Sequence, residues 1–136
     1  MTRFSANLGF LWTDRSLPDA VRAAKAAGFD AVECHWPYEN DPEDVRVALQ
    51  ETGLHMLGLN TVRGDVTAGE NGLAALVGRE NEARAAIDQA ITYAAAIDTP
   101  NIHVMAGFAA GGQAEACFVD NLHYATAAAP DVNMSF

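Results

Sequence analysis

Short β-like runs alternate with helical segments along the whole chain of 136 residues, and this alternation most constrains the fold. The β-like runs are "RFSANL" (3–8), "DAVEC" (30–34), "HMLGLN" (55–60) and "NIHVMAG" (101–107). Helical periodicity follows each run, over 16–28, over 41–53, from Arg79 onward, and around Cys117 to just before Pro130. Four successive βα units predict a parallel sheet with right-handed crossovers, in a single domain spanning 1–136.

The first two helices carry clear start and stop signals. Ser16 with Asp19 three residues later resembles a capping box, and Gly28 suits the C-terminal stop. In the second helix Asp41 is placed to cap, Pro42 lies in the first turn, and a glycine at 53 ends the pattern. These signals fix the helix boundaries independently of hydrophobic periodicity.

Side-chain alternation in the β-like runs indicates which of the two main forms of parallel sheet is present, the open sheet or the closed barrel. Each run has one apolar face and one face with a polar group near its C-terminal end. The apolar sets are Phe4, Ala6 and Leu8; Val32 and Cys34; Leu57 and Leu59; Ile102 and Val104. An open sheet covered on both faces would show near-continuous apolar runs. The pattern instead predicts an α/β barrel, with strands in the order 1-2-3-4 and helices on one face only. A TIM (β/α)8 barrel has eight units in about 250 residues, so four units predict its N-terminal half.

Charge and composition exclude several partners. The net charge of −10, with no cluster of the eight Lys and Arg residues, argues against nucleic acid and anionic membranes. No apolar run approaches the roughly 20 residues that span a bilayer. Two cysteines without metal-ligand spacing are typical of reduced thiols and predict a cytoplasmic location.

Four stretches carry a family resemblance: "RFSANLGFLW", "AAGFDAVECHWPY", "GENGLAALVGRE" and "HVMAGF". The chain resembles the hydroxypyruvate isomerase family of xylose-isomerase-like barrels from Arg3 to about Ala129. Enzymes acting on 2-oxo-tetronates are similar as well, so the resemblance leaves the small hydroxy-keto acid substrate open. It implies conversion of hydroxypyruvate to tartronate semialdehyde through an enediolate, with a carboxylate acid/base pair and a divalent Mg²⁺ or Mn²⁺.

The resemblance ends after Pro130. The family continues into a fifth strand similar to "LLIEPLN", whose glutamate binds metal, whereas this chain reads "DVNMSF". The resemblance therefore implies that the catalytic base and the metal ligands lie outside these residues and that the chain is inactive alone. A non-catalytic half-barrel remnant and an open flavodoxin-like regulatory domain are the alternatives.

Polar residues at the ends of the β-like runs predict half of a substrate pocket. They are Asn7, Glu33, Asn60 and His103, which share the inward face at the C-terminal mouth. Buried polar groups need partners, and a carboxylate at 33 would hold a pocket histidine or arginine. His103 is either a pocket residue or a core histidine. His35, Trp36 and Tyr38 either wall the pocket or pack.

The polar loop "NTVRGDVTAGENG" (60–72) follows the third run, on the face where barrels keep their chemistry. Arg63 is predicted to clamp the substrate carboxylate; the alternative is an ion pair with Asp65 or Glu70. Arg79 is expected to pair with Glu82 or to cap the loop.

Open sheet edges on the first and fourth strands predict self-association, because unpaired edges and an uncovered inner face invite pairing. Met56 and Met105 are expected to be exposed with them.

Overall fold

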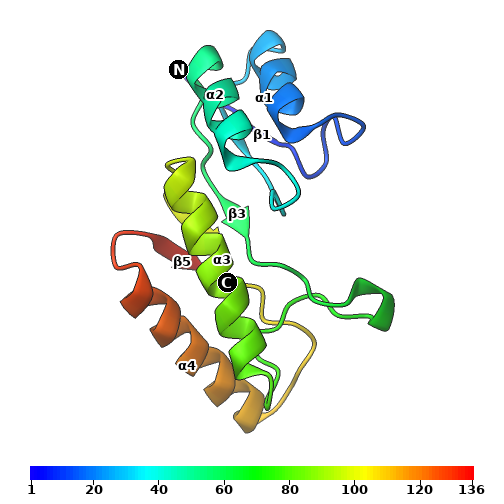
Figure 1. Cartoon of the computed structure of the whole chain (residues 1–136), viewed down its shortest axis with the longest axis vertical. Coiled ribbons are helices and arrows are strands. Elements are labelled where there is room, and N and C mark those ends of the chain that lie inside the picture. Colours follow the sequence, from blue (N-terminus) through cyan, green and yellow to red (C-terminus); the bar gives the residue numbers. More distant parts are fainter.

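The computed structural model describes all residues, 1–136. In chain order the elements are β1 (Ser5–Asn7), α1 (Leu17–Ala26), β2 (Ala31–Glu33), α2 (Pro42–Thr52), β3 (Leu59–Asn60), the 3₁₀ turn η1 (Val66–Ala68), α3 (Glu80–Ala96), β4 (Asn101–His103), α4 (Gly112–Ala128) and β5 (Asn133–Ser135). Figure 1 shows the helices arranged along one elongated body, with the loop that contains η1 projecting from its side.

The predicted caps of α1 and α2 are confirmed. The Ser16 hydroxyl accepts a hydrogen bond from the Asp19 N–H at 3.3 Å, and the Asp41 carboxylate accepts one from Glu43 N–H at 2.8 Å. Gly53 ends α2 in the left-handed conformation, with φ of 68°. Each cap satisfies backbone groups that a helix end leaves without an intrahelical partner.

The strands follow the predicted order. β1 pairs in parallel with β2, and β3 pairs in parallel with β4. Backbone hydrogen bonds join these pairs across the middle: Val32 N–H donates to His55 O at 3.0 Å, and Leu57 N–H donates to Val32 O at 2.7 Å. The first four strands therefore lie in the order 1-2-3-4, and the order 2-1-3-4 of a flavodoxin-like sheet is not found.

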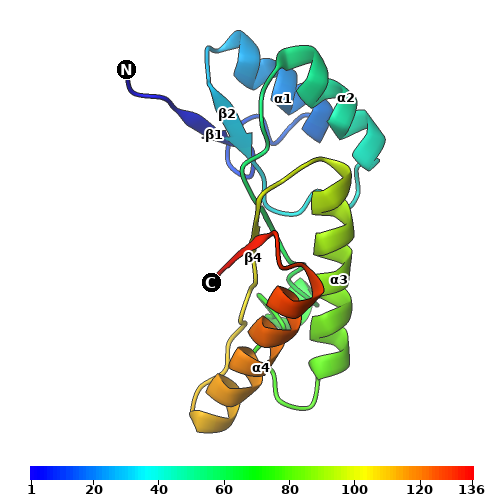
Figure 2. The same ribbon diagram turned by 90° about the vertical axis from the view of Figure 1, so that its left-hand side faces the viewer.

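The helices lie together on one side of the strands, as Figure 2 shows. The main core fills the space between the two layers. Its largest fully buried side chains include Met56, Leu59, Ile87, Ile102, Val21, Val32, Val45 and Val104. The opposite face of the strands has no covering layer in this chain, which leaves it accessible for a site.

A fifth strand corrects the expectation of four βα units. β5 pairs in parallel with β4, placing Ile102 beside Met134 and His103 beside Ser135. Val104 N–H donates to Ser135 O at 2.8 Å. The exposed edges are therefore those of β1 and β5, not of β1 and β4. Three residues are too few to show a period-2 pattern in sequence, so pairing with β4 decides this strand.

The third strand corrects two burial expectations. Met56 is 1% exposed and belongs to the core, whereas Leu57, expected on the apolar face, is 36% exposed. Met56 bridges Val32, while Leu59 pairs with Ile102. In a regular strand, side chains three positions apart point to opposite faces. The alternation is interrupted between these two pairings, so Met56 and Leu59 both reach the core under the helices. Phe4 was also expected on the apolar face; it precedes β1 and is 64% exposed.

The open edges lead to a testable prediction about association. β1 and β5 each pair on one side only, and Phe4 and Phe136 lie exposed near them at 64% and 81%. We expect concentration-dependent self-association in sedimentation velocity, weakened by Phe136→Lys, because charge on an edge opposes strand addition. Val119→Lys, at an exposed position on α4, is the matched control. A compact monomer at every concentration would contradict the expectation.

Candidate functional site

Polar side chains from successive strands line one open depression on the uncovered face of the sheet. Its volume is about 460 Å³. Asn7, Glu33, Asn60 and His103 all line it, together with His35, Asn101 and Ser135. The structure therefore brings together the four strand-end residues that the sequence singled out. We call this depression the inner-face hollow.

Strand register explains why these residues meet. Asn7 lies beside Glu33 across β1 and β2, and Asn60 lies beside His103 across β3 and β4. The register of parallel strands places equivalent C-terminal positions at one edge, so the polar groups form a row. His103 is half-buried and faces this hollow, which excludes the alternative of a core histidine.

The local contacts of two of the four determine what they can offer to a ligand. The Asn7 side-chain oxygen accepts a hydrogen bond from Gly9 N–H at 2.9 Å, which occupies its acceptor and leaves its amide group for the hollow. Glu33 forms no ion pair with a histidine or arginine, contrary to the expected role of holding one. Because the hollow is open, this carboxylate is half-buried and does not need a charged partner.

The polar loop after β3 is ordered by its own carboxylates. The Asp65 side chain accepts hydrogen bonds from Thr67 N–H at 3.0 Å and Ala68 N–H at 3.2 Å, and begins η1. Its bonds to the Thr67 hydroxyl and to these amides hold the pKa of Asp65 below its usual range. These hydrogen bonds give the loop a defined conformation, although residues 64–69 are exposed.

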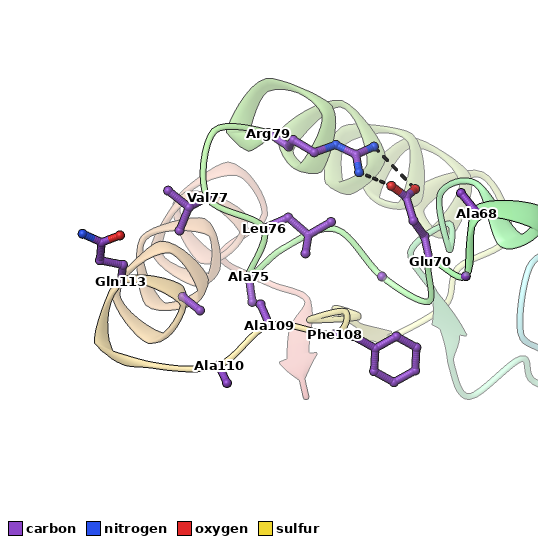
Figure 3. A pocket seen from close by; sticks show the side chains of 13 residues that line it. Ala68, Glu70, Ala75, Leu76, Val77, Arg79, Phe108, Ala109, Ala110 and Gln113 are labelled. Atoms are coloured by element: carbon purple, nitrogen blue, oxygen red, sulfur yellow. Dashed lines mark hydrogen bonds and ion pairs between the residues drawn. The ribbon is translucent and has the colours of Figure 1, made fainter.

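An arginine closes the same loop at its far end. Arg79 pairs with Glu70 and donates from Nε to Glu82 at 2.7 Å, which confirms the expected pairing with Glu82. The hydrogen bond from Arg79 lowers the pKa of Glu70, which also accepts from Asp65 N–H at 2.6 Å. Figure 3 shows this ion pair on the wall of a second hollow of about 550 Å³, between the loop and the start of α4. Apolar side chains such as Leu76, Val77 and Phe108 line the rest of it.

Backbone contact with the loop after β4 fixes the position of this segment. Leu73 N–H donates to Met105 O at 3.1 Å, and Ala75 N–H donates to Ala106 O at 2.8 Å. Gly72 forms a bridge with Ala106 at the point of closest approach. Backbone hydrogen bonds therefore join the loops that follow β3 and β4, beside the second hollow.

Arg63 is oriented by two contacts that are not ion pairs. Its Nε donates to the Asn71 side-chain oxygen at 2.7 Å, and its guanidinium carbon lies 4.7 Å from the centre of the Trp36 ring. The alternative pairing with Asp65 or Glu70 is wrong, because those carboxylates bind backbone amides and Arg79. The two terminal nitrogens of Arg63 have no protein partner. A half-buried cation held in this way is suited to binding an anion.

The three aromatic residues after β2 have different roles: one packs against the core, one binds the polar loop, and one lines the inner-face hollow. The Tyr38 hydroxyl donates to Asn60 O at 2.5 Å, its ring packs edge-on against Tyr93, and burial raises its pKa; it is a packing residue that supports β3. Trp36 Nε1 donates to Thr61 O at 3.1 Å, which ties it to the polar loop. His35 lines the hollow itself.

The cysteines offer no reactive group. Cys34 and Cys117 are both free and buried, and desolvation raises the pKa of Cys34 to about 12. A thiol of that acidity stays protonated at neutral pH and is a poor nucleophile.

The residues of this chain do not by themselves fit a Mg²⁺ or Mn²⁺ site. Glu33 is the one carboxylate that lines the inner-face hollow, and no group of three or more His, Cys, Asp or Glu residues is arranged to hold a metal ion. Hard cations take about six oxygen ligands in octahedral sites. Ligands for such an ion would have to be supplied from outside these residues.

A parallel sheet with helices on one face and polar groups at the carboxyl ends of its strands defines half of a (β/α)8 barrel. The family model described as a xylose isomerase-like TIM barrel matches residues 21–135, and the chain belongs to that family.

No helix is both long enough and apolar enough to cross a membrane.

Sequence relatives carry isomerase names. A "Putative hydroxypyruvate isomerase" of Homo sapiens is 44% identical over 132 residues, covering 90% of this chain and 48% of the relative. A "2-oxo-tetronate isomerase" of Cupriavidus necator is 41% identical over 133 residues, covering 95% of this chain and 51% of the relative. The chain thus spans about half the length of the curated relatives it matches.

Solved structures agree on the fold. The crystal structure of AP endonuclease, family 2 from Brucella melitensis superposes with a TM-score of 0.90 at 34% identity, covering 98% of this chain and 54% of that one. A D-allulose 3-epimerase from Methylomonas sp. superposes with a TM-score of 0.74 at 17% identity, covering 96% of this chain and 49% of that one. At that identity the second likeness concerns the fold alone.

Proposed function

We propose that this chain supplies half of the substrate pocket of an isomerase that converts hydroxypyruvate to tartronate semialdehyde. The observation that carries the proposal is the inner-face hollow, where polar groups from four strand ends converge in a chain of this family. A relative at 44% identity that is named "Putative hydroxypyruvate isomerase" supports the choice of substrate.

The proposed recognition groups come from the inner-face hollow and from Arg63, which belongs to the polar loop after β3 and is not among the residues that line the hollow. Arg63 clamps the substrate carboxylate, because its two free terminal nitrogens match a planar, bidentate anion. The Asn7 amide, Asn60 and His103 face the hydroxyl and carbonyl oxygens of the acid. Glu33, as the one carboxylate that lines the hollow, provides a hydrogen-bond acceptor for a substrate hydroxyl.

The proton transfer itself needs groups beyond this chain. In the conversion a proton leaves C3 of hydroxypyruvate, an enediolate forms, and a proton returns to C2. Removal and return both require a positioned acid and base, and the hollow has a single carboxylate. The Mg²⁺ or Mn²⁺ that the family resemblance implies would likewise take its ligands from the remainder of a complete barrel.

A second candidate is the isomerisation of 2-oxo-tetronates. It is favoured by a relative of that name at 41% identity, and the open hollow of about 460 Å³ has room for a four-carbon acid. Both candidates share the carboxylate and the adjacent oxygens, so they differ only in the length of the carbon chain.

A complete barrel would decide between the two substrates. We would join residues 1–129 to the C-terminal half of the human relative and measure kcat/KM for both acids. We expect the three-carbon acid to be preferred, and His103→Ala to lower kcat/KM about 10- to 100-fold, because a hydrogen bond to a charged intermediate contributes roughly 1.5–3 kcal/mol. His123→Ala, at an exposed position on α4, is the matched control and should change little. Preference for the four-carbon acid would select the second candidate, and turnover of neither acid would overturn the proposal.

A further inference from the structure

His35 lines the inner-face hollow, and neighbouring aromatic rings hold its imidazole in place. Its imidazole packs edge-on against Phe10 at 4.9 Å between ring centres, and at 5.1 Å against Trp36. Both neighbours are exposed, at 75% and 37%. Large aromatic side chains left in solvent gain little from burial, so their arrangement around this ring is not explained by core packing.

Gly9 makes room for the same imidazole. A Cβ at this position would overlap the His35 ring, while the backbone of Gly9 has an ordinary φ that other residues adopt. The glycine is therefore required by the histidine ring and not by a turn. Because Gly9 has no side chain, the His35 ring packs directly against the backbone after β1.

The ring nitrogens of His35 have no hydrogen-bond partner in the protein, although the ring is held on three sides. Trp36 packs against one side of the ring, and the guanidinium carbon of Arg63 lies 4.7 Å from the centre of the Trp36 ring. One indole thus contacts two polar groups, an imidazole without a hydrogen-bond partner and a guanidinium whose two terminal nitrogens have none. A buried or half-buried polar group without a protein partner is usually satisfied by water or by a ligand.

We propose that His35 and Arg63 together form an acid-recognition site on Trp36, in which Arg63 binds the carboxylate of a small 2-hydroxy or 2-oxo acid and His35 donates a hydrogen bond to it. The inference rests on the proposed function for its substrate class. It adds His35 as a binding residue, with Gly9 and Trp36 as positioning residues that hold the two groups.

Binding is measured on the 136-residue chain without turnover, so the result is independent of isomerase activity. The chain has two tryptophans, and Trp12→Phe leaves Trp36 as the only indole reporter. We would titrate this variant with tartronate, a three-carbon 2-hydroxy dicarboxylate, at constant ionic strength. A saturable change in Trp36 fluorescence is expected.

Three substitutions in that background test the assignment. His35→Phe keeps a ring of similar size in its seat but removes the donor, and should weaken binding about ten-fold. Arg63→Gln should weaken it by at least that factor, and Gly9→Ala should act like His35→Phe because it displaces the ring. Arg3→Gln and Gly112→Ala are the matched controls. Arg3 is exposed, a Cβ at Gly112 meets nothing within 4 Å, and both variants should bind as the parent does.

Each outcome is informative. Loss of binding in Arg63→Gln but not in His35→Phe would remove His35 from the site and leave the Arg63 clamp standing. Equal fluorescence changes in all variants, or none in the parent, would overturn the acid-recognition site. Neither result would bear on whether a complete barrel isomerises hydroxypyruvate, because the assay contains no catalytic step.

Discussion

A polypeptide of these 136 residues is expected to show no measurable isomerisation of hydroxypyruvate, with or without added Mg²⁺ or Mn²⁺. The inner-face hollow has one carboxylate, Glu33, and no cluster of side chains suited to a metal ion. A positioned general acid or base contributes typically 10²–10⁴-fold, so lacking the acid/base pair should remove about 10⁴-fold or more of the rate. A steady-state assay that follows tartronate semialdehyde formation measures this directly.

The control is the chain extended beyond residue 129 by the C-terminal half of the human relative, assayed at the same concentration. Turnover that returns only with the extension would agree with half of a pocket that needs its catalytic groups. Metal-dependent turnover by the 136 residues alone would show that acid–base groups of this chain have been misplaced. Removal of Glu33 by Glu33→Gln in that active chain would then identify the carboxylate involved.

Local sequence signals were sufficient for the helices and for the order of the strands. Ser16, Asp41 and Gly53 act within one turn of the chain, so their effect on the backbone does not depend on distant contacts. The row of polar groups from Asn7 to His103 was also predictable. It follows from alternation within each strand together with parallel pairing, and both are visible as sequence periods.

All the features that the sequence did not predict depend on contacts between separate segments of the chain. Met56 and Leu59 reach the same core because the third strand changes partner contacts between them, which no period-2 rule anticipates. β5 exists because β4 offers it an edge. The choice of partner for Arg63 was undecidable for the same reason, since it depended on where Arg79 and Asn71 would lie.

From the sequence, His35 is predicted only to wall the pocket or to pack. The signal that distinguishes it is Gly9, twenty-six positions away, whose missing side chain is explained only when both loops are seen together. A glycine without a turn requirement is therefore a marker for a close neighbour, although sequence does not identify that neighbour.

Gly72→Ala is expected to destabilise the chain by roughly 3 kcal/mol or more. Gly72 has φ of 123°, and a Cβ there would lie 2.5 Å from Gly107 N and 2.6 Å from Met105 O. Both obstacles are backbone atoms, so no side chain can rotate away to relieve the overlap. Relief requires the loops after β3 and β4 to separate, breaking the hydrogen bonds of Leu73 and Ala75. Because a domain is stable by only about 5–15 kcal/mol, this one methyl group should remove a large part of the total.

Gly69→Ala is the matched control for the cost of the backbone conformation itself. Gly69 also has a positive φ, 85°, but a Cβ there meets nothing within 4 Å. It should cost about 1–2 kcal/mol, measured like Gly72→Ala from the midpoint and slope of urea unfolding. Equal losses in the two variants would mean that the loops separate without cost and are not joined in solution.

A double substitution gives the sharper test of the contact between the two loops. Gly107→Ala should cost about as much as Gly72→Ala, because its Cβ would overlap the carbonyl group of Gly72. Once either methyl group has forced the loops apart, the second no longer meets the opposing backbone and adds only its conformational cost. The double variant should therefore lose roughly 1–3 kcal/mol less than the sum of the single variants, the size of coupling seen between residues in direct contact. Strict additivity would show that the loops are not in contact when the chain is folded. In that case the loop that contains Arg63 would not be held in place by its contact with the loop after β4.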